Sequence, residues 1–466
     1  MTGPRPVLVI DIVGLTPRLL PEMPRLSALA HEGFCAQLGT VLPAVTCTVQ
    51  STLLTGLLPA RHGIVGNGWY FRDLGEVLLW RQHNRLVEGE KVWEAARRAR
   101  PGLRTANLCW WYAMGASTEV ILTPRPVYHA DGRKSPDCYT RPAALHDELE
   151  GLLGAFPLFS FWGPAAGIAS SRWLGRACVH VLDRHWPDLT LLYLPHLDYD
   201  LQRFGPDAPE AISAAHKIDE VAGAVVEAAR ARGIIVVALS EYGITGVRRP
   251  VDVNRHLRRA GLLQVHTQAG MEYLDPPASQ AFAVADHQVA HVYIRDPGMV
   301  AKVQDLLAEL DGVDDVLDEA GKRAAGLGHE RAGELVAVAE PDAWFTYSYW
   351  LDDARAPDFA RTVDIHRKPG YDPAELFFDP ADPFAKVRAG LALARSRLGL
   401  RSTLSVVPLD PTCVRGSHGR LPSDPLDGPV LLCSDPTHAR DRLAATDVKA
   451  FLLALAAGPG SAATWI

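Results

Sequence analysis

Three stretches of the chain are almost entirely apolar, without the polar alternation of a half-exposed strand, which is typical of strands buried on both faces of a sheet. These stretches are Val7–Val13 (VLVIDIV), Leu189–Asp198 (LTLLYLPHLD) and Gly233–Gly243 (GIIVVALSEYG). Helical patterns lie between them at Pro21–Glu32, which is followed by Gly33 as a helix terminator, and at Ala214–Arg232. This alternation predicts an α/β fold with a doubly wound, mostly parallel sheet and helices on both faces.

The rest of the chain is less regular. Residues 73–161 and 250–411, approximately, are rich in Trp, Pro and short elements, and they predict insertions that form a cap and part of a second sheet. Further helices are expected around Asp382–Leu398 and at Val448–Ala457. Because no repeat or low-complexity tract divides the sequence, we expect one α/β domain over residues 1–466.

Composition and charge exclude several classes of protein. The net charge is −7 and the 47 Lys and Arg residues are scattered, which argues against binding of a nucleic acid duplex. No stretch approaches the roughly 20 apolar residues of a membrane span, so none is expected. The N-terminus lacks a signal-peptide pattern, and the seven cysteines form no CxxC pair. The sequence therefore predicts reduced thiols and a cytoplasmic location.

Each apolar stretch carries a carboxylate near its end: Asp11, Asp198 and Glu241. In open α/β sheets, ligands bind beyond the carboxyl ends of the strands. Three acids delivered to one edge repel one another unless a cation lies between them, so the pattern favours a metal site. The alternative is that each acid only caps the helix or turn that follows.

Thr46 lies where the extended segment of LPAVTCTVQSTLLTG passes into a predicted helix. The N-terminus of a helix presents free N–H groups and the positive end of its dipole, and both favour anions. A hydroxyl group at this place can serve as a nucleophile toward a phosphorus atom. The alternative is an ordinary N-cap, for which threonine is common.

The segments VIDIVG and PAVTCTVQSTLLTGLLPARHGIVGNGWY resemble the alkaline phosphatase superfamily, and most closely its nucleotide pyrophosphatase/phosphodiesterase branch. The phosphonoacetate hydrolases share the same arrangement. The resemblance implies that Asp11 is a metal ligand, that Thr46 is both nucleophile and ligand, and that Asn67 contacts a phosphate oxygen. It gives Arg61 and His62 a structural role.

Later segments extend the resemblance to an alkaline phosphatase-like order of elements over nearly the whole chain. These segments are HLDYDLQRFGP, ALSEYGI and GSHGR. One metal ion would then be held by Asp198, Gln202 and His418, and a second by Asp11, Thr46, Glu241 and Tyr242.

Three of these positions depart from the family pattern. Gln202 stands where the family has His, Glu241 where it has Asp, and Tyr242 where it has a second His. The family implies zinc, but the loss of two imidazoles moves the ligand set toward oxygen, which suits magnesium, manganese or calcium. The chain is therefore expected to bind one or two divalent ions, of Zn, Mn or Mg.

Other residues could also supply the missing ligands. His287 and His291 lie in ADHQVAHVYI, and Asp364 and His366 lie in TVDIHRKPGYDP. The cationic residues beside His366 would also suit a substrate phosphate. For each His the alternative is an ordinary structural imidazole.

The implied reaction is hydrolysis of a small-molecule phosphodiester or pyrophosphate through a phosphothreonine at Thr46. A phosphonoacetate-type C–P hydrolase is one alternative, and a non-catalytic descendant that binds a phosphoryl ligand is another. The Trp-rich stretches Cys109–Tyr112 and Phe161–Trp162 could line a pocket for the leaving group or belong to the core. The sequence leaves the leaving group and the oligomeric state open.

Overall fold

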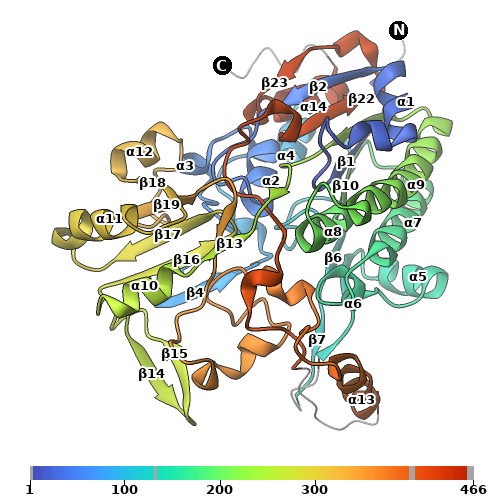
Figure 1. Ribbon diagram of the computed structural model, residues 1–466. Coiled ribbons are helices and arrows are strands. Elements are labelled where there is room, and N and C mark those ends of the chain that lie inside the picture. The colour runs from blue at the N-terminus through green and yellow to red at the C-terminus, as the bar shows by residue number, and fades with distance from the viewer. Residues whose placement is uncertain (1–3, 131–133, 398–404, 459–466) are drawn as a thin grey trace.

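The three apolar stretches form neighbouring strands at the centre of a nine-stranded sheet (Figure 1). The computed structural model describes residues 4–130, 134–397 and 405–458. Strand β1 (Val7–Ile12) pairs in parallel with β10 (Leu189–Leu194) on one side and with β11 (Ile235–Leu239) on the other. Every residue of the three strands is buried, as expected for a sheet covered on both faces.

The full strand order is β23-β2-β22-β11-β1-β10-β5-β6-β9. The outer strands are β23 (Arg442–Leu443), β2 (Phe34–Leu38), β22 (Val430–Cys433), β5 (Thr105–Leu108), β6 (Val120–Pro124) and β9 (Cys138–Arg141). The strands from β11 to β6 are all parallel, while β22 and β9 pair with their neighbours in antiparallel orientation. The sequence-based prediction of a doubly wound, mostly parallel α/β sheet is therefore confirmed.

Helices cover this sheet in two groups, on either side of β1 and β10 (Figure 1). One group contains α1 (Pro24–Glu32), α7 (Ile168–His185) and α9 (Pro209–Ala231), and the other contains α2 (Thr46–Thr55), α4 (Val92–Ala99) and α14 (Val448–Ala457). The helices expected near residues 21–32, 214–232 and 448–457 are thus α1, α9 and α14. The helix expected at 382–398 is α13 (Ala385–Arg397), and Leu398 lies outside the described residues.

The two segments expected to be insertions differ in what they build. Residues 73–161 supply β5, β6 and β9 of the central sheet, so this segment forms one flank of the core as well as covering it. Its other elements are β4 (Glu76–Leu79), β7 (Val127–Tyr128), β8 (Lys134–Ser135), α4, α5 (Ala144–Leu153) and α6 (Leu158–Phe161).

Residues 250–411 form a second, antiparallel sheet in the order β16-β17-β19-β18, with its own apolar core. Its strands are β16 (Ala281–Asp286), β17 (Val289–Ile294), β19 (Leu335–Ala339) and β18 (Val313–Leu317). Three helices accompany it: α10 (Val253–Arg259), α11 (Val300–Ala308) and α12 (Glu319–Ala324). The division into a single domain with two insertions stays a prediction.

Short elements connect these layers. They are α3 (Pro59–His62), β3 (Gly68–Phe71), α8 (His196–Phe204), β12 (Thr245–Gly246), β13 (Arg249–Val251), β14 (Val265–Gln268), β15 (Met271–Leu274), β20 (Ala343–Phe345) and β21 (Gly416–Ser417). β12 and β21 form a separate two-stranded sheet, and their pairing brings the segment of His418 beside the residues that follow β11, although the two segments are far apart in sequence.

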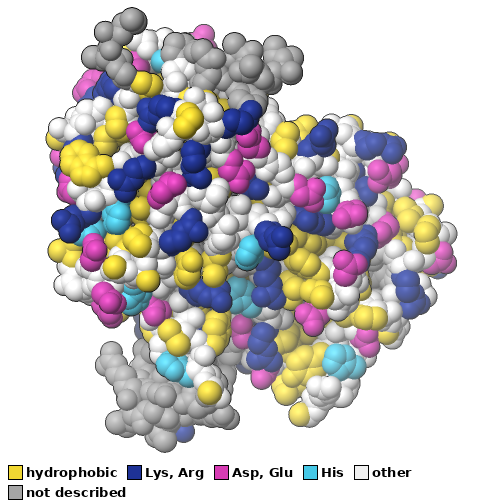
Figure 2. All heavy atoms as spheres, turned by 180° about the vertical axis from the view of Figure 1, so that it is seen from behind, with side chains coloured by type: hydrophobic (Ala, Val, Ile, Leu, Met, Phe, Trp, Pro, Cys, Tyr) yellow, Lys and Arg dark blue, Asp and Glu magenta, His cyan; other side chains and the backbone are white. Residues whose placement is uncertain are grey.

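The surface agrees with the charge pattern of the sequence. Lys and Arg side chains are interspersed with Asp and Glu across the face shown in Figure 2. No helix among the described residues is long and apolar enough to cross a membrane. All seven cysteines are free.

Candidate functional site

The carboxyl ends of β1 and β11 deliver two of the three predicted acids to one place. Asp11 lies in β1 directly opposite Leu239 of β11, and Glu241 follows that strand by two residues. Asp198 reaches the site differently: β10 ends at Leu194, Pro195 caps α8, and Asp198 lies in the first turn of that helix. The expectation that all three acids end strands is therefore corrected for Asp198, because Pro195 terminates the strand early.

Thr46 is the first residue of α2, and Val45 in extended conformation is the N-cap. The Thr46 side chain is therefore not the cap, and its hydroxyl group faces the site. Its Oγ1 atom lies 2.9 Å from the Tyr242 hydroxyl oxygen, and either oxygen can be the donor. The next amide, Cys47 N–H, donates to Asn67 Oδ1 at 3.0 Å, so Asn67 fixes the start of the helix.

Asp11 and Glu241 lie side by side and share one hydrogen-bond donor. Gln50 Nε2 donates to Asp11 Oδ2 at 3.0 Å and to Glu241 Oε1 at 2.6 Å. Both carboxyl groups are completely buried. Burial raises the pKa of Asp11 to about 7 and raises that of Glu241 well above its ordinary value, in the second case with help from the neighbouring Asp11 charge.

Asp198 has its own set of supporting residues. Gln202 Nε2 donates to Asp198 Oδ2 at 2.9 Å, and Gln202 Oε1 accepts a hydrogen bond from the Tyr371 hydroxyl group at 3.0 Å. Both ends of the Gln202 amide are therefore engaged, and in this arrangement Gln202 positions Asp198. His418 Nδ1 lies 2.8 Å from the Ala44 carbonyl oxygen, which leaves Nε2 facing Asp198 Oδ1 at 3.9 Å.

A column of stacked rings joins these two groups of residues. Tyr242 stacks on His418 and His287 stacks on Tyr371, while the rings of His418 and His287 between them are tilted by 37°; each pair has a centroid separation of 3.7 Å. His287 Nδ1 lies 2.8 Å from Asp286 Oδ1, so its Nε2 atom points away from that carboxylate. The column brings residues from four distant parts of the sequence into contact.

Asn67, expected to contact a phosphate oxygen, is tied to the second sheet. Its backbone N–H donates to Asp286 Oδ2 at 2.7 Å, and its side-chain Nδ2 donates to Asp286 Oδ1 at 3.0 Å. One Nδ2 hydrogen remains for another acceptor, because an amide nitrogen carries two. His62, expected to be structural, accepts from the Ile64 amide and lies 2.9 Å from Thr52 Oγ1.

The residues fit a divalent cation by the chemistry of their free atoms. Three buried carboxylate oxygens, Asp11 Oδ1, Asp198 Oδ1 and Glu241 Oε2, make no hydrogen bond, and neither does His287 Nε2. Burial raises the pKa of Asp198 to about 7, so without a compensating positive charge these acids tend to hold protons. Oxygen atoms predominate in this set, which suits Mg²⁺ or Mn²⁺ as well as Zn²⁺.

Of the four alternative ligand residues, only His287 lies among the predicted ligands in the part of the chain that the structure describes. His287 reaches the site, as part of the ring column. The ring of His291 is occupied elsewhere, because Nε2 lies 2.8 Å from the Val65 carbonyl oxygen and Nδ1 accepts from the Gly333 amide. Asp364 and His366 line the adjoining cavity, but within the described residues neither makes a hydrogen bond or ion pair with a predicted ligand.

A cavity of about 710 Å³ opens beside Thr46, and Asp198, Tyr242 and His418 also line it. This volume is within the usual range for a small-molecule site. Aromatic side chains form much of its wall, among them Trp80 and Trp111, whose rings lie 4.9 Å apart. Of the two Trp-rich stretches, Trp111, Phe161 and Trp162 line the cavity, whereas Trp110 is completely buried in the core.

A buried lysine anchors the loop that forms another wall of this cavity. Lys368 is 1% exposed, and its Nζ atom lies 2.7 Å from both Asp372 Oδ2 and Glu375 Oε1. Glu375 also accepts hydrogen bonds from the Trp162 indole at 2.6 Å and from the Asp364 amide at 2.9 Å. One ion-pair network thus connects wall residues that are more than 200 positions apart.

Two supporting residues were not found from the sequence. Gln50 follows Thr46 by four residues, and this helical spacing places both on one face of α2, which is the signal that could have identified it. Tyr371 has no such local signal. Its contact with Gln202 depends on the way the second half of the chain folds over α8.

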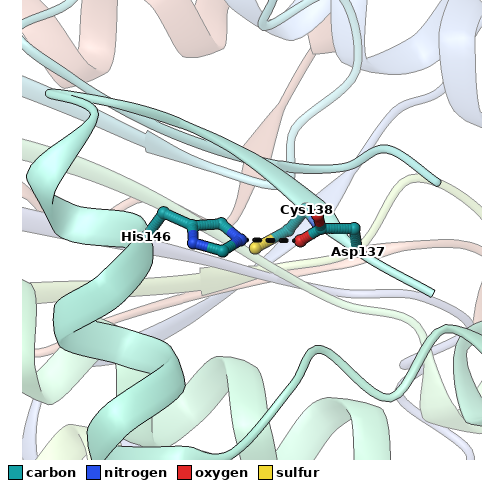
Figure 3. A group of neighbouring side chains, drawn as sticks. All are labelled: Asp137, Cys138 and His146. Carbon is teal, nitrogen blue, oxygen red and sulfur yellow. Dashed lines mark hydrogen bonds and ion pairs between the residues drawn. The ribbon is translucent and has the colours of Figure 1, made fainter. Parts of the chain in front are cut away.

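Outside this site, Asp137, Cys138 and His146 form a cluster between β9 and α5 (Figure 3). His146 Nε2 lies 2.7 Å from Asp137 Oδ1 and Nδ1 lies 3.1 Å from Asp147 Oδ1, and these contacts raise the pKa of the imidazole. Burial raises the pKa of the Cys138 thiol to about 12. Because both ring nitrogens already face carboxylates, the cluster is satisfied as an ion pair.

The chain is similar to known proteins over most of its length. It shares 27% identity over 257 residues with an uncharacterised pyrophosphatase/phosphodiesterase of Schizosaccharomyces pombe, an alignment that spans 52% of this chain and only 42% of that relative. The fold matches phosphonoacetate hydrolase from Sinorhizobium meliloti, solved with phosphonoformate, with a TM-score of 0.62 and 17% identity over 97% of this chain and 96% of that one.

The fold also matches murine ectonucleotide pyrophosphatase/phosphodiesterase 5, with a TM-score of 0.58 and 15% identity over 97% of this chain and 95% of that one. The family model of type I phosphodiesterases / nucleotide pyrophosphatases matches residues 7–372. This range includes helix α2 with Thr46 and the three acids Asp11, Asp198 and Glu241. The chain therefore belongs to the type I phosphodiesterase / nucleotide pyrophosphatase family, a family of hydrolases within the alkaline phosphatase superfamily.

Proposed function

We propose that this protein is a metal-dependent phosphohydrolase that cleaves a small-molecule phosphodiester or pyrophosphate through a phosphothreonine formed at Thr46. One observation carries the proposal. The Thr46 hydroxyl group lies at the N-terminus of α2, on the wall of the cavity, beside buried carboxylates that have unpartnered oxygen atoms.

The reaction would proceed by two in-line displacements. Thr46 Oγ1 attacks the phosphorus atom, its P–O bond forms while the bond to the leaving group breaks, and the leaving group departs as an alkoxide or phosphate. Water then attacks the phosphorus of the phosphothreonine, the bond between phosphorus and Thr46 Oγ1 breaks, the phosphoryl group leaves as phosphate or its monoester, and a proton from the water restores the Thr46 hydroxyl group. The hydrogen bond between Thr46 and Tyr242 aims the nucleophile, and the backbone N–H of Thr46 with Asn67 Nδ2 would hold the phosphoryl oxygens.

Asp11, Glu241, Asp198 and His418 are the residues that would hold the metal, one or two ions per chain. Thr46 and Tyr242 are further predicted ligands, as is Gln202, although its amide is engaged by Asp198 and Tyr371 and would serve to position Asp198. A divalent cation held by these residues would supply Lewis acidity, lowering the pKa of a nearby hydroxyl group and offsetting phosphoryl charge. The family implies zinc, whereas the oxygen-rich ligand set supports Mn²⁺ or Mg²⁺. Reconstituting the metal-free protein with each ion separates these choices.

The cavity supports an ester or anhydride with a sizeable leaving group over phosphonoacetate. Phosphonoacetate is smaller than the aromatic-lined space beside Thr46, whose volume is about 710 Å³. Basic side chains on the wall, among them Arg125 and Arg367, would accept a leaving group that carries negative charge. Gln202 and Tyr242 stand where the family has His. For this reason a non-catalytic role, in which the protein only binds a phosphoryl ligand, remains the second candidate.

Replacement of the nucleophile tests the proposal. We expect Thr46→Ala to lower kcat on bis-p-nitrophenyl phosphate by at least about 10³-fold, since covalent catalysis and its second step both disappear. Thr48→Val is the matched control, because Thr48 lies in the same helix, is completely buried and has a hydroxyl group without a partner.

Three outcomes decide between the candidates. Wild-type activity in Thr46→Ala would contradict the threonine mechanism. Release of phosphate from phosphonoacetate, without cleavage of any diester, would support the C–P hydrolase. A wild-type chain that binds p-nitrophenyl phosphate but turns over no substrate with Zn²⁺, Mn²⁺ or Mg²⁺ would support the binding role.

A further inference from the structure

The amide group of Gln50 connects the two strand-end acids to the wall of the cavity. Its Nε2 atom donates to Asp11 Oδ2 and Glu241 Oε1, and its Oε1 atom accepts a hydrogen bond from the Trp111 backbone N–H at 2.7 Å. The side chain is completely buried. Every hydrogen-bonding direction of the Gln50 nitrogen is therefore used.

The orientation of this amide follows from its partners. A backbone N–H can only donate, so the Gln50 oxygen must face Trp111 and the nitrogen must face the two carboxylates. The two N–H bonds then match two acceptors, one on Asp11 and one on Glu241. No other assignment satisfies all three partners.

Each of the two acids has a second, buried oxygen that Gln50 does not engage. Gln50 engages Asp11 Oδ2 and Glu241 Oε1, whereas Asp11 Oδ1 and Glu241 Oε2 have no hydrogen-bond partner. Each acid thus keeps one supported oxygen and one free oxygen. Thr46 lies one helical turn before Gln50, so α2 delivers the nucleophile and this amide to the same place.

We propose that Gln50 is a positioning residue that holds Asp11 and Glu241 as a pair, each with one oxygen free for a divalent cation. The inference rests on the proposed function, because it assigns Gln50 a role toward the metal of that site. Supporting residues of this kind typically change metal affinity by about 10–100-fold when they are replaced. Trp111 fixes the amide, and this contact also couples the cavity wall to the two acids.

Metal affinity of the metal-free protein tests this role. We expect Gln50→Met, which keeps the length of the side chain and removes both N–H donors, to weaken the calorimetric Kd for Mn²⁺ by about 10–100-fold. Gln50→Asn keeps an amide that is one methylene shorter and cannot bridge both acids, and we expect the same direction of change. Thr48→Val, on the same helix, should leave the Kd within about threefold of wild type, because its hydroxyl group has no partner.

The possible results separate the two proposals. If wild type binds Mn²⁺ and a folded Gln50→Met variant binds it with an unchanged Kd, the role of Gln50 is contradicted and the proposed function stands. If Gln50→Met does not fold, the Kd of Gln50→Asn decides in the same way. If wild type binds none of Mn²⁺, Mg²⁺ and Zn²⁺, the metal dependence of the proposed function fails, and the role of Gln50 fails with it.

Discussion

Replacement of Asp198 by Asn separates the stability of the site from its function. The carboxyl group is almost completely buried, and burial raises its pKa from 3.8 to about 7. Between these values the folded chain holds a proton that the unfolded chain has lost, so the metal-free protein loses stability as the pH rises from about 4 to 7. Asn has no charge at any of these pH values, and it can keep the hydrogen bond from Gln202.

The size of the effect follows from the shift in pKa. A shift of about 3 units at 1.36 kcal/mol per unit gives about 4 kcal/mol as an upper value, and entry of water into the unfilled site reduces it. We therefore expect Asp198→Asn to be more stable than wild type by about 1–4 kcal/mol at pH 8 in a chelator, and by close to zero at pH 4. Activity should be lost in the same variant.

Urea unfolding in EDTA, followed by circular dichroism at several pH values from 4 to 8.5, measures this difference. Asp207→Asn is the matched control, since Asp207 is exposed just after α8 and its replacement should change stability by less than about 0.5 kcal/mol. An Asp198→Asn variant that is less stable than wild type at pH 8 without metal would refute the reasoning. Addition of Mn²⁺ should reverse the order, because only wild type retains the full ligand set.

Two further substitutions test supporting contacts. Tyr242→Phe removes the hydroxyl group 2.9 Å from Thr46 Oγ1, and we expect kcat on bis-p-nitrophenyl phosphate to fall about tenfold, the equivalent of about 1.4 kcal/mol, with little change in KM; an unchanged kcat would show that this contact does not aim the nucleophile. Lys368→Met leaves two buried carboxylates without their cation, and we expect a loss of about 3–5 kcal/mol in the free energy of unfolding by urea at pH 7. The exposed Lys302→Met serves as its control, and equal stability of the two variants would argue against the buried ion-pair network.

Local sequence patterns were sufficient to predict the central strands, in which every residue is buried. The runs that became β1, β10 and β11 are short and almost entirely apolar, and every residue of these strands is buried, as expected for strands covered on both faces. Helix α14 begins and ends at the predicted residues. The segment 73–161 was harder to interpret, because its strands β5, β6 and β9 are short and are separated by long irregular connections.

Part of the candidate site was also predictable, since strand ends and a helix N-terminus are local features. Asp11, Thr46 and Glu241 lie close to where the sequence placed them. Asp198 lies near the site but in α8, because a single proline shifted the end of the strand. The sequence alone could not show that Gln202 supports Asp198, since that depends on Tyr371 from a distant loop.

By itself, the sequence determined the central parallel sheet, the position of Asp11 and Glu241 near the ends of its strands, and the helix that begins at Thr46, because each depends on a short local run of residues. Only the tertiary structure decided how these acids are supported. The Gln50 amide between Asp11 and Glu241, and the column of rings from Tyr242 to Tyr371, join segments far apart in the chain. Such contacts depend on packing between layers rather than on local periodicity, so no pattern within a single segment reveals them.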